Sequence, residues 1–544
     1  MLPDIDTLSL DQQIAQMVVV RASGFLFDHQ IQYPAWEPPT VTLQHWVTEL
    51  GVGGVILVGG SAAELALRNQ QLQEWAAIPL LLAADVEEGV GQRFSGATWF
   101  PPPMALAEIA QTDTARATQY AEQMGATIAR EAEAVGLNWV LAPVVDINNN
   151  PNNPVINVRA FGESPSLVGQ LTTAFIRGAQ QYPVLTVAKH FPGHGDTAID
   201  SHLDLPTLPH DWERLQTVEL LPFKAAIAAG VDAVMSAHLK IPALDNQFPA
   251  TLSRRLLTEA LRQHLGFTGL IVTDALVMGA IAHRYGANEA PVLAVEAGAD
   301  IVLMPLDPEG AIMAIRNAVA AGRISPERIR ASVERIWRAK QRVVAPSLKA
   351  DFSHRWEQVP YGLEPAPFVA ALAQPGSRAL VGNIVRDALR VYQPQHSRLN
   401  HSKWRENFRN LILLDQATDC DYLRHNSPAI ALPQQKGYQL QLVDHCSPAF
   451  PFNMVDAQHW SPTLLQLFIR GNPFRGSAGL AHTIQLWLNF LLQSDQLQAL
   501  VVYGSPYVLE QFLPELPADL PYVFSYGQMP QAQAIALKAL GFEA

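Results

Sequence analysis

The chain has 544 residues, 2 cysteines and 40 prolines, and 37 Lys+Arg against 50 Asp+Glu give a net charge of −13. This length predicts more than one domain. The acidic balance argues against a nucleic-acid partner, and the sequence has no run of about 18 uncharged apolar residues that would span a membrane. The N-terminus carries acidic residues and no Lys or Arg before Arg21, whereas a secretion signal begins with positive charge. Two cysteines are too few for a disulfide framework, and both features favour a cytoplasmic protein. Cys420 and Cys446 lack metal or redox spacing, and we expect buried thiols.

Residues 1–345 alternate short apolar runs with longer segments of helical spacing. The apolar runs lie at 16–20, 54–58, 80–85, 138–146, 184–191, 232–238, 269–274 and 299–305. Their near-continuous apolar character is typical of parallel strands that are buried on both faces. Eight strand–helix units predict a (β/α)₈ barrel, the TIM barrel, over residues 1–345.

Residues 346–376 are irregular and punctuated by proline, which predicts a linker. After it, residues 377–544 alternate more weakly. Strands are expected at 411–415, 438–444, 465–470, 499–504 and 522–527, and a helix at 532–541. This pattern predicts a smaller αβα sandwich domain after the barrel, so the whole chain is of the α/β class.

Five of the eight predicted barrel strands end in ionisable residues. These residues are Asp85, Asp146, Lys189 with His190, His238, and Asp274. Burying a charge is costly unless the charge is paired or hydrogen-bonded. Active sites of such barrels lie at the carboxyl ends of the strands. We therefore predict a functional site where these five strand ends meet.

The segment 189–202, KHFPGHGDTAIDSH, is rich in imidazole and carboxylate side chains and contains two glycines. One hypothesis makes His190, His194, Asp196, Asp200 and His202 metal ligands, although their spacing matches no standard zinc pattern. The other hypothesis pairs Asp200 with His202, so that the carboxylate orients an imidazole that works as an acid and base.

Asp274 follows the apolar run GLIVT and precedes ALVMGAI. A carboxylate at the end of a buried strand can act as a nucleophile towards an electrophilic carbon. The same position also suits the N-cap of a following helix. The sequence leaves both roles open.

Four segments carry a family resemblance: LAADVEEGVGQRF (82–94), APVVDINNNPNNPVINVRAFGE (142–163), AKHFPGHGDTAIDSHLDLP (188–206) and IVTDAL (271–276). Together they resemble the family 3 glycoside hydrolases, specifically the β-N-acetylglucosaminidases of the cell-wall-recycling type in their two-domain form. One departure lies after the third strand, where Glu88 and Val90 stand at positions that are usually Gly and Arg in the family.

The resemblance implies roles for particular residues. Asp274 becomes the nucleophile that forms a covalent glycosyl-enzyme, and His202 becomes the acid/base, paired with Asp200 on a mobile loop. The substrate-binding residues are Asp85, Arg93, Arg159, Lys189, His190 and His238.

The expected activity is retaining, exo-acting hydrolysis of terminal β-linked N-acetylglucosamine, as in peptidoglycan recycling. The partner is then a small carbohydrate, and no metal or cofactor is expected. A β-glucosidase or a β-glycoside phosphorylase on the same scaffold is the first alternative, because an imidazole acid/base does not repel phosphate as a carboxylate does. A metal-dependent barrel hydrolase and a sugar-binding protein without catalysis are the others.

Overall fold

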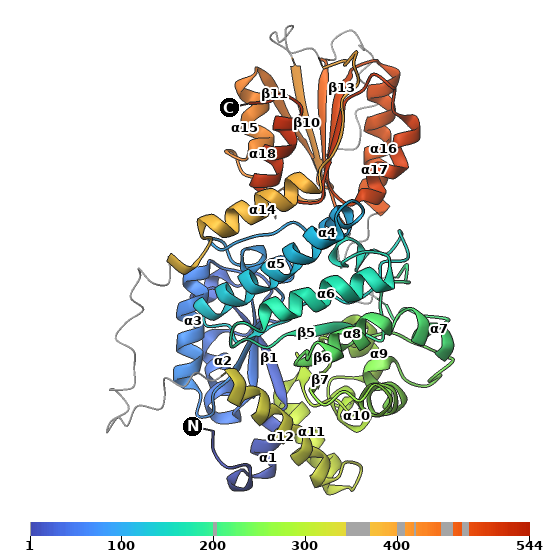
Figure 1. Ribbon diagram of the computed structural model, residues 1–544. Coiled ribbons are helices and arrows are strands. Elements are labelled where there is room, and N and C mark those ends of the chain that lie inside the picture. The colour runs from blue at the N-terminus through green and yellow to red at the C-terminus, as the bar shows by residue number, and fades with distance from the viewer. Residues whose placement is uncertain are drawn as a thin grey trace. The chain divides into compact units, whose positions relative to one another are not determined.

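The computed structural model describes residues 2–199, 204–343, 370–399, 408–417, 420–447, 461–470 and 478–543 (Figure 1). The chain forms two compact units. The first contains residues 1–100, 115–150 and 160–378, and the second contains 101–114, 151–159 and 379–544. Most of the predicted linker, 346–376, lies outside the described residues.

The first unit contains two parallel sheets. The five-stranded sheet has the order β4-β3-β2-β1-β8, and the three-stranded sheet has the order β5-β6-β7. The strands are β1 (Val18–Ser23), β2 (Gly54–Val58), β3 (Leu81–Ala84), β4 (Trp139–Val140), β5 (Val187–Phe191), β6 (Ala233–Ser236), β7 (Leu270–Val272) and β8 (Val302–Leu303). Single parallel bridges, Trp139 to Leu185 and Val272 to Ile301, connect one sheet to the other. Each predicted run therefore contains or overlaps an observed strand.

Helices connect these strands, and local sequence determines where they begin. Ser61 caps α3 (Ala62–Trp75) because its hydroxyl accepts from the Glu64 backbone N–H while the Glu64 carboxylate accepts from the Ser61 N–H. The other helices of this unit are η1 (Ile5–Thr7), α1 (Leu10–Ala15), η2 (Asp28–Gln30), α2 (Thr40–His45), η3 (Trp46–Leu50), η4 (Val90–Gln92), α5 (Thr114–Ala134), α6 (Pro165–Ala179), α7 (Trp212–Thr217), α8 (Leu221–Ala228), η6 (Ala250–Leu252), η7 (Arg255–His264), α9 (Gly279–Tyr285), α10 (Glu289–Ala297), α11 (Pro308–Ala320) and α12 (Pro326–Val343).

The second unit is built on a six-stranded sheet of order β11-β10-β12-β13-β14-β9. The strands are β9 (Arg390–Tyr392), β10 (Phe408–Leu414), β11 (Tyr438–Val443), β12 (Thr463–Ile469), β13 (Leu497–Gly504) and β14 (Tyr522–Ser525). All pairs are parallel except β14 with β9. The five strands expected from the sequence correspond to β10 to β14, and the antiparallel edge strand β9 was not predicted.

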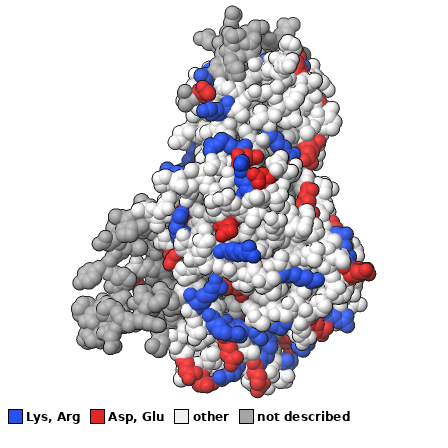
Figure 2. All heavy atoms as spheres, viewed as in Figure 1, with Lys and Arg blue, Asp and Glu red and all other residues white. Residues whose placement is uncertain are grey.

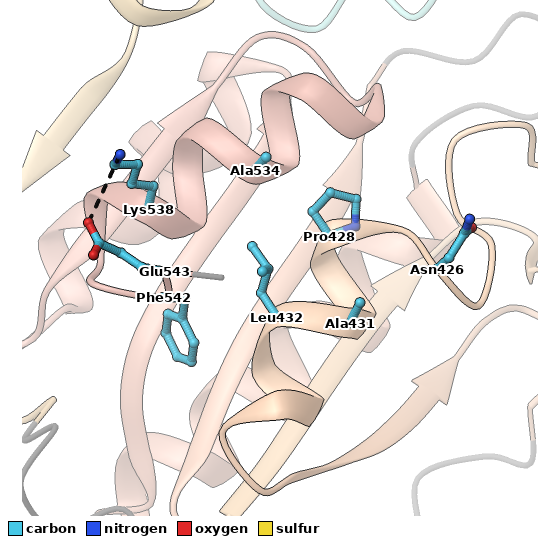
Figure 3. A pocket seen from close by; sticks show the side chains of 8 residues that line it. All are labelled: Asn426, Pro428, Ala431, Leu432, Ala534, Lys538, Phe542 and Glu543. Atoms are coloured by element: carbon cyan, nitrogen blue, oxygen red, sulfur yellow. Dashed lines mark ion pairs between the residues drawn. The ribbon is translucent and has the colours of Figure 1, made fainter.

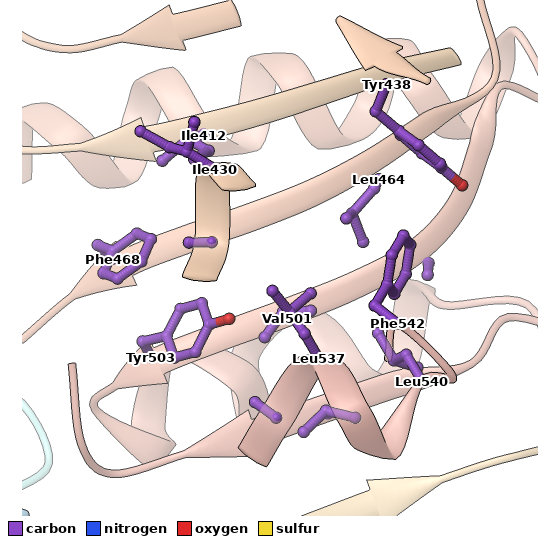
Figure 4. Packing of buried hydrophobic residues seen from close by; sticks show 14 of the residues in the cluster. Ile412, Ile430, Tyr438, Leu464, Phe468, Val501, Tyr503, Leu537, Leu540 and Phe542 are labelled. Carbon is purple, nitrogen blue, oxygen red and sulfur yellow. The ribbon is translucent and has the colours of Figure 1, made fainter. Parts of the chain in front are cut away.

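Helices lie on both faces of this second sheet, with α15 and α18 on one side and α16 and α17 on the other (Figure 1). Their bounds, with the unit's remaining helices, are α4 (Met104–Ala110), η5 (Asn157–Arg159), α14 (Pro375–Asp387), α15 (Pro428–Gln435), α16 (Ala478–Gln493), α17 (Pro506–Phe512), η13 (Leu513–Glu515) and α18 (Pro530–Ala539). The core under α15 and α18 includes Ile412, Leu464, Val501, Leu537 and Phe542 (Figure 4). Alternate residues of β10, β12 and β13 thus fill the space between sheet and helices.

Surface charges of both signs are interspersed on the face shown in Figure 2. Among the exposed ion pairs of the described residues, Arg323 pairs with both Glu289 and Glu296. In the part of the chain that the structure describes, no helix has the length and apolar character needed to cross a bilayer.

The prediction of two buried thiols is wrong for Cys446, which is exposed, and Cys420 is only partly buried. Cys446 lies in the exposed turn after β11, three residues beyond the strand's last residue Val443, so it is not part of the packed sheet.

Candidate active site

Parallel strands deliver most of the predicted site residues to one edge of the first unit. Asp85 follows β3, Lys189 and His190 lie within β5, His238 follows β6, and Asp274 follows β7. The carboxyl ends of neighbouring parallel strands meet at the same edge of a sheet, which is where ligand-binding residues of α/β folds lie.

Lys189 is a buried cation held by two carboxylates. Its side chain is 1% exposed, and its Nζ lies 2.8 Å from Asp85 Oδ1 and 2.6 Å from Glu87 Oε1. A buried ammonium is tolerated because opposite charges compensate for lost hydration. Glu87 is also buried, whereas Asp85 remains 40% exposed. Asp85 therefore combines a fixed position with access to a ligand.

Sequence reasoning missed Glu87 as a partner of Lys189. The available signal was the segment Asp-Val-Glu-Glu after β3, which places a second carboxylate two residues beyond Asp85.

Asp146 is the buried carboxylate that organises the segment after β5. It accepts hydrogen bonds from the His190 N–H at 3.1 and 3.2 Å and from the His194 N–H at 2.7 Å, and its Oδ2 lies 2.7 Å from His190 Nδ1. Burial opposes the charged form, but attraction to His190 and these hydrogen bonds hold the pKa of Asp146 below its ordinary value. Asp146 is therefore an anion that fixes both histidines.

His194 is fully enclosed and remains neutral near pH 7. Burial lowers its pKa to about 4, although the carboxylates of Asp146 and Asp274 oppose that effect. The ring meets His190 edge to face at 6.2 Å between centroids, and its Nδ1 lies 3.1 Å from Thr197 Oγ1. His194 is therefore a buried neutral ring packed between Asp146, His190 and Thr197.

Asp274 is a half-buried carboxylate whose backbone is tied to the neighbouring strand. Its N–H donates to Ser236 O at 3.2 Å, and its Oδ1 accepts from the Ala275 N–H at 2.8 Å. The N-cap role considered for Asp274 is wrong, because α9 begins at Gly279 and its N-cap is Met278. The residue thus lies in a loop rather than at a helix start.

His238 holds the backbone next to Asp274. Its Nε2 lies 3.0 Å from Ala275 O and its Nδ1 lies 2.8 Å from Thr251 Oγ1, and the side chain is completely buried. A carbonyl oxygen only accepts, so Nε2 carries a proton and donates. This geometry favours a positioning role for His238, and its predicted contact with substrate stays a prediction.

Of the remaining predicted site residues, Arg93 contacts the group through the backbone of Asp85, and the described side-chain contact of Arg159 is to its own segment. Arg93 is exposed, and its Nε donates to Asp85 O at 3.2 Å. Arg159 ends η5 in the second unit and donates from Nη1 to Val155 O at 3.0 Å. Asp200 and His202, the predicted acid/base pair, lie outside the described residues.

The metal hypothesis for the 189–202 segment finds no support among the described residues. Within them, three ligand atoms of His, Cys, Asp or Glu come within 4.8 Å of one another only at Asp444, His445 and Cys446, in the second unit. Asp196 instead lies 3.0 Å from His210 Nε2.

A hollow of about 340 Å³ in the second unit offers little chemistry (Figure 3). Apolar side chains of α15 and the C-terminal segment line most of it, including Pro428, Leu432 and Phe542. At its rim Lys538 pairs with Glu543 at 4.0 Å, so its charged groups there already neutralise each other.

Comparison with known families matches both parts of the chain. Residues 9–339 match the glycosyl hydrolase family 3 N-terminal domain, and residues 401–541 match the bacterial glycosyl hydrolase family 3 C-terminal domain. The chain belongs to glycosyl hydrolase family 3. The resemblance seen in the sequence is therefore confirmed, and the two-domain α/β architecture is that of the family.

Individual relatives of this family 3 chain agree with that assignment. It is 33% identical over 352 residues to the β-hexosaminidase A of Pseudoalteromonas piscicida, covering 58% of each chain. It is 38% identical over 265 residues to a β-hexosaminidase of Tolumonas auensis, covering 48% of this chain and 78% of that one. This chain therefore aligns with less than two thirds of the length of the Pseudoalteromonas β-hexosaminidase A.

Solved structures match along nearly the whole chain. A family 3 β-N-acetylglucosaminidase from Paenibacillus sp. superposes with a TM-score of 0.78 at 31% identity, covering 99% of this chain and 98% of that one. A β-glucoside phosphorylase superposes equally well, with a TM-score of 0.78, but at 21% identity, which shows the fold alone.

Proposed function

We propose that this family 3 chain is a retaining exo-glycosidase that removes terminal β-linked N-acetylglucosamine from small carbohydrates. The observation that carries the proposal is the Asp274 carboxylate, held at a strand end by hydrogen bonds with the backbone of Ser236 and Ala275. The names of the β-hexosaminidase relatives and of the Paenibacillus structure support the choice of sugar.

The scaffold in this proposal is a closed (β/α)₈ barrel over residues 1–345. The parallel bridges Trp139–Leu185 and Val272–Ile301 support closure, because they join the edges of the two sheets at both junctions. Asp274 and the Lys189 group then face one mouth.

Asp274 attacks the anomeric carbon and forms a covalent glycosyl ester, which water later hydrolyses. His202, oriented by Asp200, donates a proton to the leaving oxygen and then removes one from water. An unperturbed imidazole titrates near pH 6.5 and serves both steps around neutrality.

Three described imidazoles of the candidate site are neutral or already have hydrogen-bond partners. His194 stays neutral because its pKa is about 4, His238 donates to a backbone carbonyl, and His190 is paired with Asp146. The proposal therefore assigns the proton-donor role to His202, as the family resemblance implies.

In this proposal Asp85, Lys189 and His190 bind sugar hydroxyls, with Arg93 and Arg159 as further hydrogen-bond donors. The Asp85 carboxylate suits this task because Lys189 fixes it while 40% of its side chain stays exposed. Charge-assisted hydrogen bonds of this type are stronger than neutral ones. In the cytoplasm the substrates are then β-N-acetylglucosaminides released from the cell wall.

The test compares nitrophenyl β-N-acetylglucosaminide with nitrophenyl β-glucoside, with and without phosphate, and after treatment with a chelator. Asp274→Asn should lower kcat roughly 1,000-fold or more, which corresponds to about 4 kcal/mol of transition-state stabilisation. Asp11→Asn is the matched control, because Asp11 is an exposed carboxylate on α1 that pairs with Arg316. Unchanged turnover by Asp274→Asn contradicts the proposed nucleophile.

The arms of that assay separate the alternatives. Preference for the glucoside indicates a β-glucosidase, sugar 1-phosphate as product indicates a phosphorylase, and loss of turnover with the chelator indicates a metal-dependent hydrolase. His202→Ala should lose far less activity on the nitrophenyl glycoside than on a disaccharide, because nitrophenolate departs without a proton. An equal loss on both substrates excludes the acid role.

A further inference from the structure

The turn after β11 brings three different metal-binding side chains together on the second unit. Asp444, His445 and Cys446 follow the last residue of the strand, and one ligand atom from each lies within 4.8 Å of the other two. Cys446 Sγ is 3.2 Å from His445 Nε2. The three groups are a thiol, an imidazole and a carboxylate, so they form a mixed set rather than a patch of acidic residues.

The neighbouring strand β10 orients the imidazole. His445 Nδ1 lies 2.6 Å from Asp415 O, and the His445 backbone N–H donates to the same carbonyl at 3.3 Å. The carbonyl only accepts, so Nδ1 carries the proton and the Nε2 lone pair points to Cys446 Sγ. Metal-binding histidines are typically held in this way, by a carbonyl or carboxylate on the other ring nitrogen.

The carboxylate of Asp444 is also held in place. Its Oδ2 accepts from the Ala417 N–H at 3.1 Å, and its Oδ1 accepts from the Cys446 N–H and the Ser447 hydroxyl, both at 3.0 Å. Each carboxylate oxygen has more than one lone pair, so these hydrogen bonds leave acceptor capacity for a cation. The donors come from β10's loop as well as from the turn itself.

We propose that Asp444, His445 and Cys446 form a zinc-binding site, with a fourth position open to water. Thiolate, imidazole and carboxylate are the three ligand classes that zinc takes, whereas magnesium and calcium prefer oxygen ligands only. Zinc–sulfur and zinc–nitrogen bonds of about 2.3 and 2.0 Å at a tetrahedral angle separate the two atoms by about 3.5 Å. The 3.2 Å between Sγ and Nε2 is close to that separation.

The site is distinct from the proposed sugar chemistry. Its three ligands are different residues from those proposed to bind and cleave the sugar. Metal binding can therefore be measured separately from glycoside hydrolysis, and the proposal stands or falls independently of the proposed function.

The full-length reduced protein is first stripped of metal with a chelator that is then removed. Zinc is titrated calorimetrically, and cobalt(II) is used as a spectroscopic probe because a cobalt–thiolate bond gives an intense near-ultraviolet band. We expect one equivalent to bind with that band. Cys446→Ala should abolish the band, and His445→Gln should weaken zinc binding at least 10-fold. Cys420→Ala is the matched control and should change neither, because Cys420 is outside the ligand set.

Alkylation gives a second readout. Zinc should slow the reaction of iodoacetamide with Cys446, located by peptide mass spectrometry, and should leave Cys420 unaffected. Zinc binding that is unchanged in both Cys446→Ala and His445→Gln overturns the proposal, as does the absence of a thiolate band or of protection. Because His445 and Cys446 are exposed, both variants should fold, which circular dichroism checks.

Discussion

Lys340 offers a quantitative test of how this structure treats a buried charge. The side chain lies on α12 and is completely enclosed, and its Nζ is 2.6 Å from Gln16 Oε1. Its Nζ also lies 5.7 Å from the centroid of the Trp337 ring. Burial lowers the pKa of Lys340 from 10.5 to about 7. Both described partners are neutral, so neither offers the full opposite charge that compensates for lost hydration.

The sign of the pH effect follows from these two values. The folded protein releases this proton near pH 7 and the unfolded chain near pH 10.5, so stability increases with pH between them. The penalty is fully present below pH 7 and disappears above pH 10.5. The two pKa values differ by about 3.5, and each pKa unit corresponds to about 1.36 kcal/mol, so burying the charged amine lowers the unfolding free energy by roughly 5 kcal/mol. Between pH 7 and 9 the wild type should gain about 2 kcal/mol from this group alone.

Lys340→Met removes the titrating amine and keeps an unbranched side chain. It also removes the partner of Gln16 Oε1, a loss of roughly 1–3 kcal/mol. At pH 6 the variant should therefore be more stable than wild type by about 2–4 kcal/mol, because the larger charge penalty is gone. At pH 10 most of that penalty is already absent from the wild type, and the variant should be the less stable protein.

Urea unfolding followed by circular dichroism at pH 6, 8 and 10 measures the free energy of unfolding, and urea leaves the ionic strength constant. Lys224→Met is the matched control, since Lys224 is an exposed lysine on α8 and should show no reversal. A stability difference between Lys340→Met and wild type that is the same at every pH refutes the reasoning, because the buried amine would then keep one charge state throughout.

Three further substitutions test individual contacts. Asp146→Asn should lower turnover at least 10-fold, because His190 loses its carboxylate partner. The unfolding free energy of this variant should also fall less between pH 6 and pH 3 than that of wild type. The reason is that a carboxyl with a lowered pKa stabilises the fold only while it is ionised. Equal acid sensitivity contradicts that role. Asp300→Asn should lower the unfolding free energy in urea by about 3–5 kcal/mol, since three arginines lose their shared buried partner. The kcat of the remaining folded enzyme should be unchanged. A variant as stable as wild type would show that the arginines find other partners. His238→Ala should lower kcat about 10–100-fold with KM little changed, and His238→Gln should restore part of it by donating to Ala275 O, whereas a rise in KM alone would indicate substrate contact instead.

The strands and their charged ends could be predicted from sequence because both signals are local. A buried parallel strand reads as a short apolar run, and an ionisable residue at its end is visible in the same window. Asp85, Asp274 and the pair Lys189–His190 all follow from this pattern. The strand bounds were less accurate: the run 138–146 contains only the two-residue β4 (Trp139–Val140). There the apolar composition reflects burial rather than pairing.

Contacts between distant residues account for what sequence reasoning missed. The segment 104–134 has helical spacing throughout, yet it folds as α4 and α5, and α4 belongs to the second unit. Glu108 on α4 pairs with Arg390 and accepts from the Tyr526 hydroxyl at 3.0 Å. Pairings over hundreds of residues leave no periodic signal. The same holds for Glu87, whose role depends on Lys189 arriving from another strand.

Strand direction also separates the two kinds of buried charge in the first unit. Asp300 precedes β8 and Gln16 precedes β1, so Asp300 and the Lys340–Gln16 pair lie at the amino ends of the strands. Lys189 lies within β5, and Asp274 follows β7 at the carboxyl end. In parallel α/β folds functional residues lie at the carboxyl ends of the strands, which leaves the amino ends to contribute to stability. Substitutions at Asp300 and Lys340 should therefore move the unfolding free energy without changing kcat, while Asp274→Asn should do the reverse.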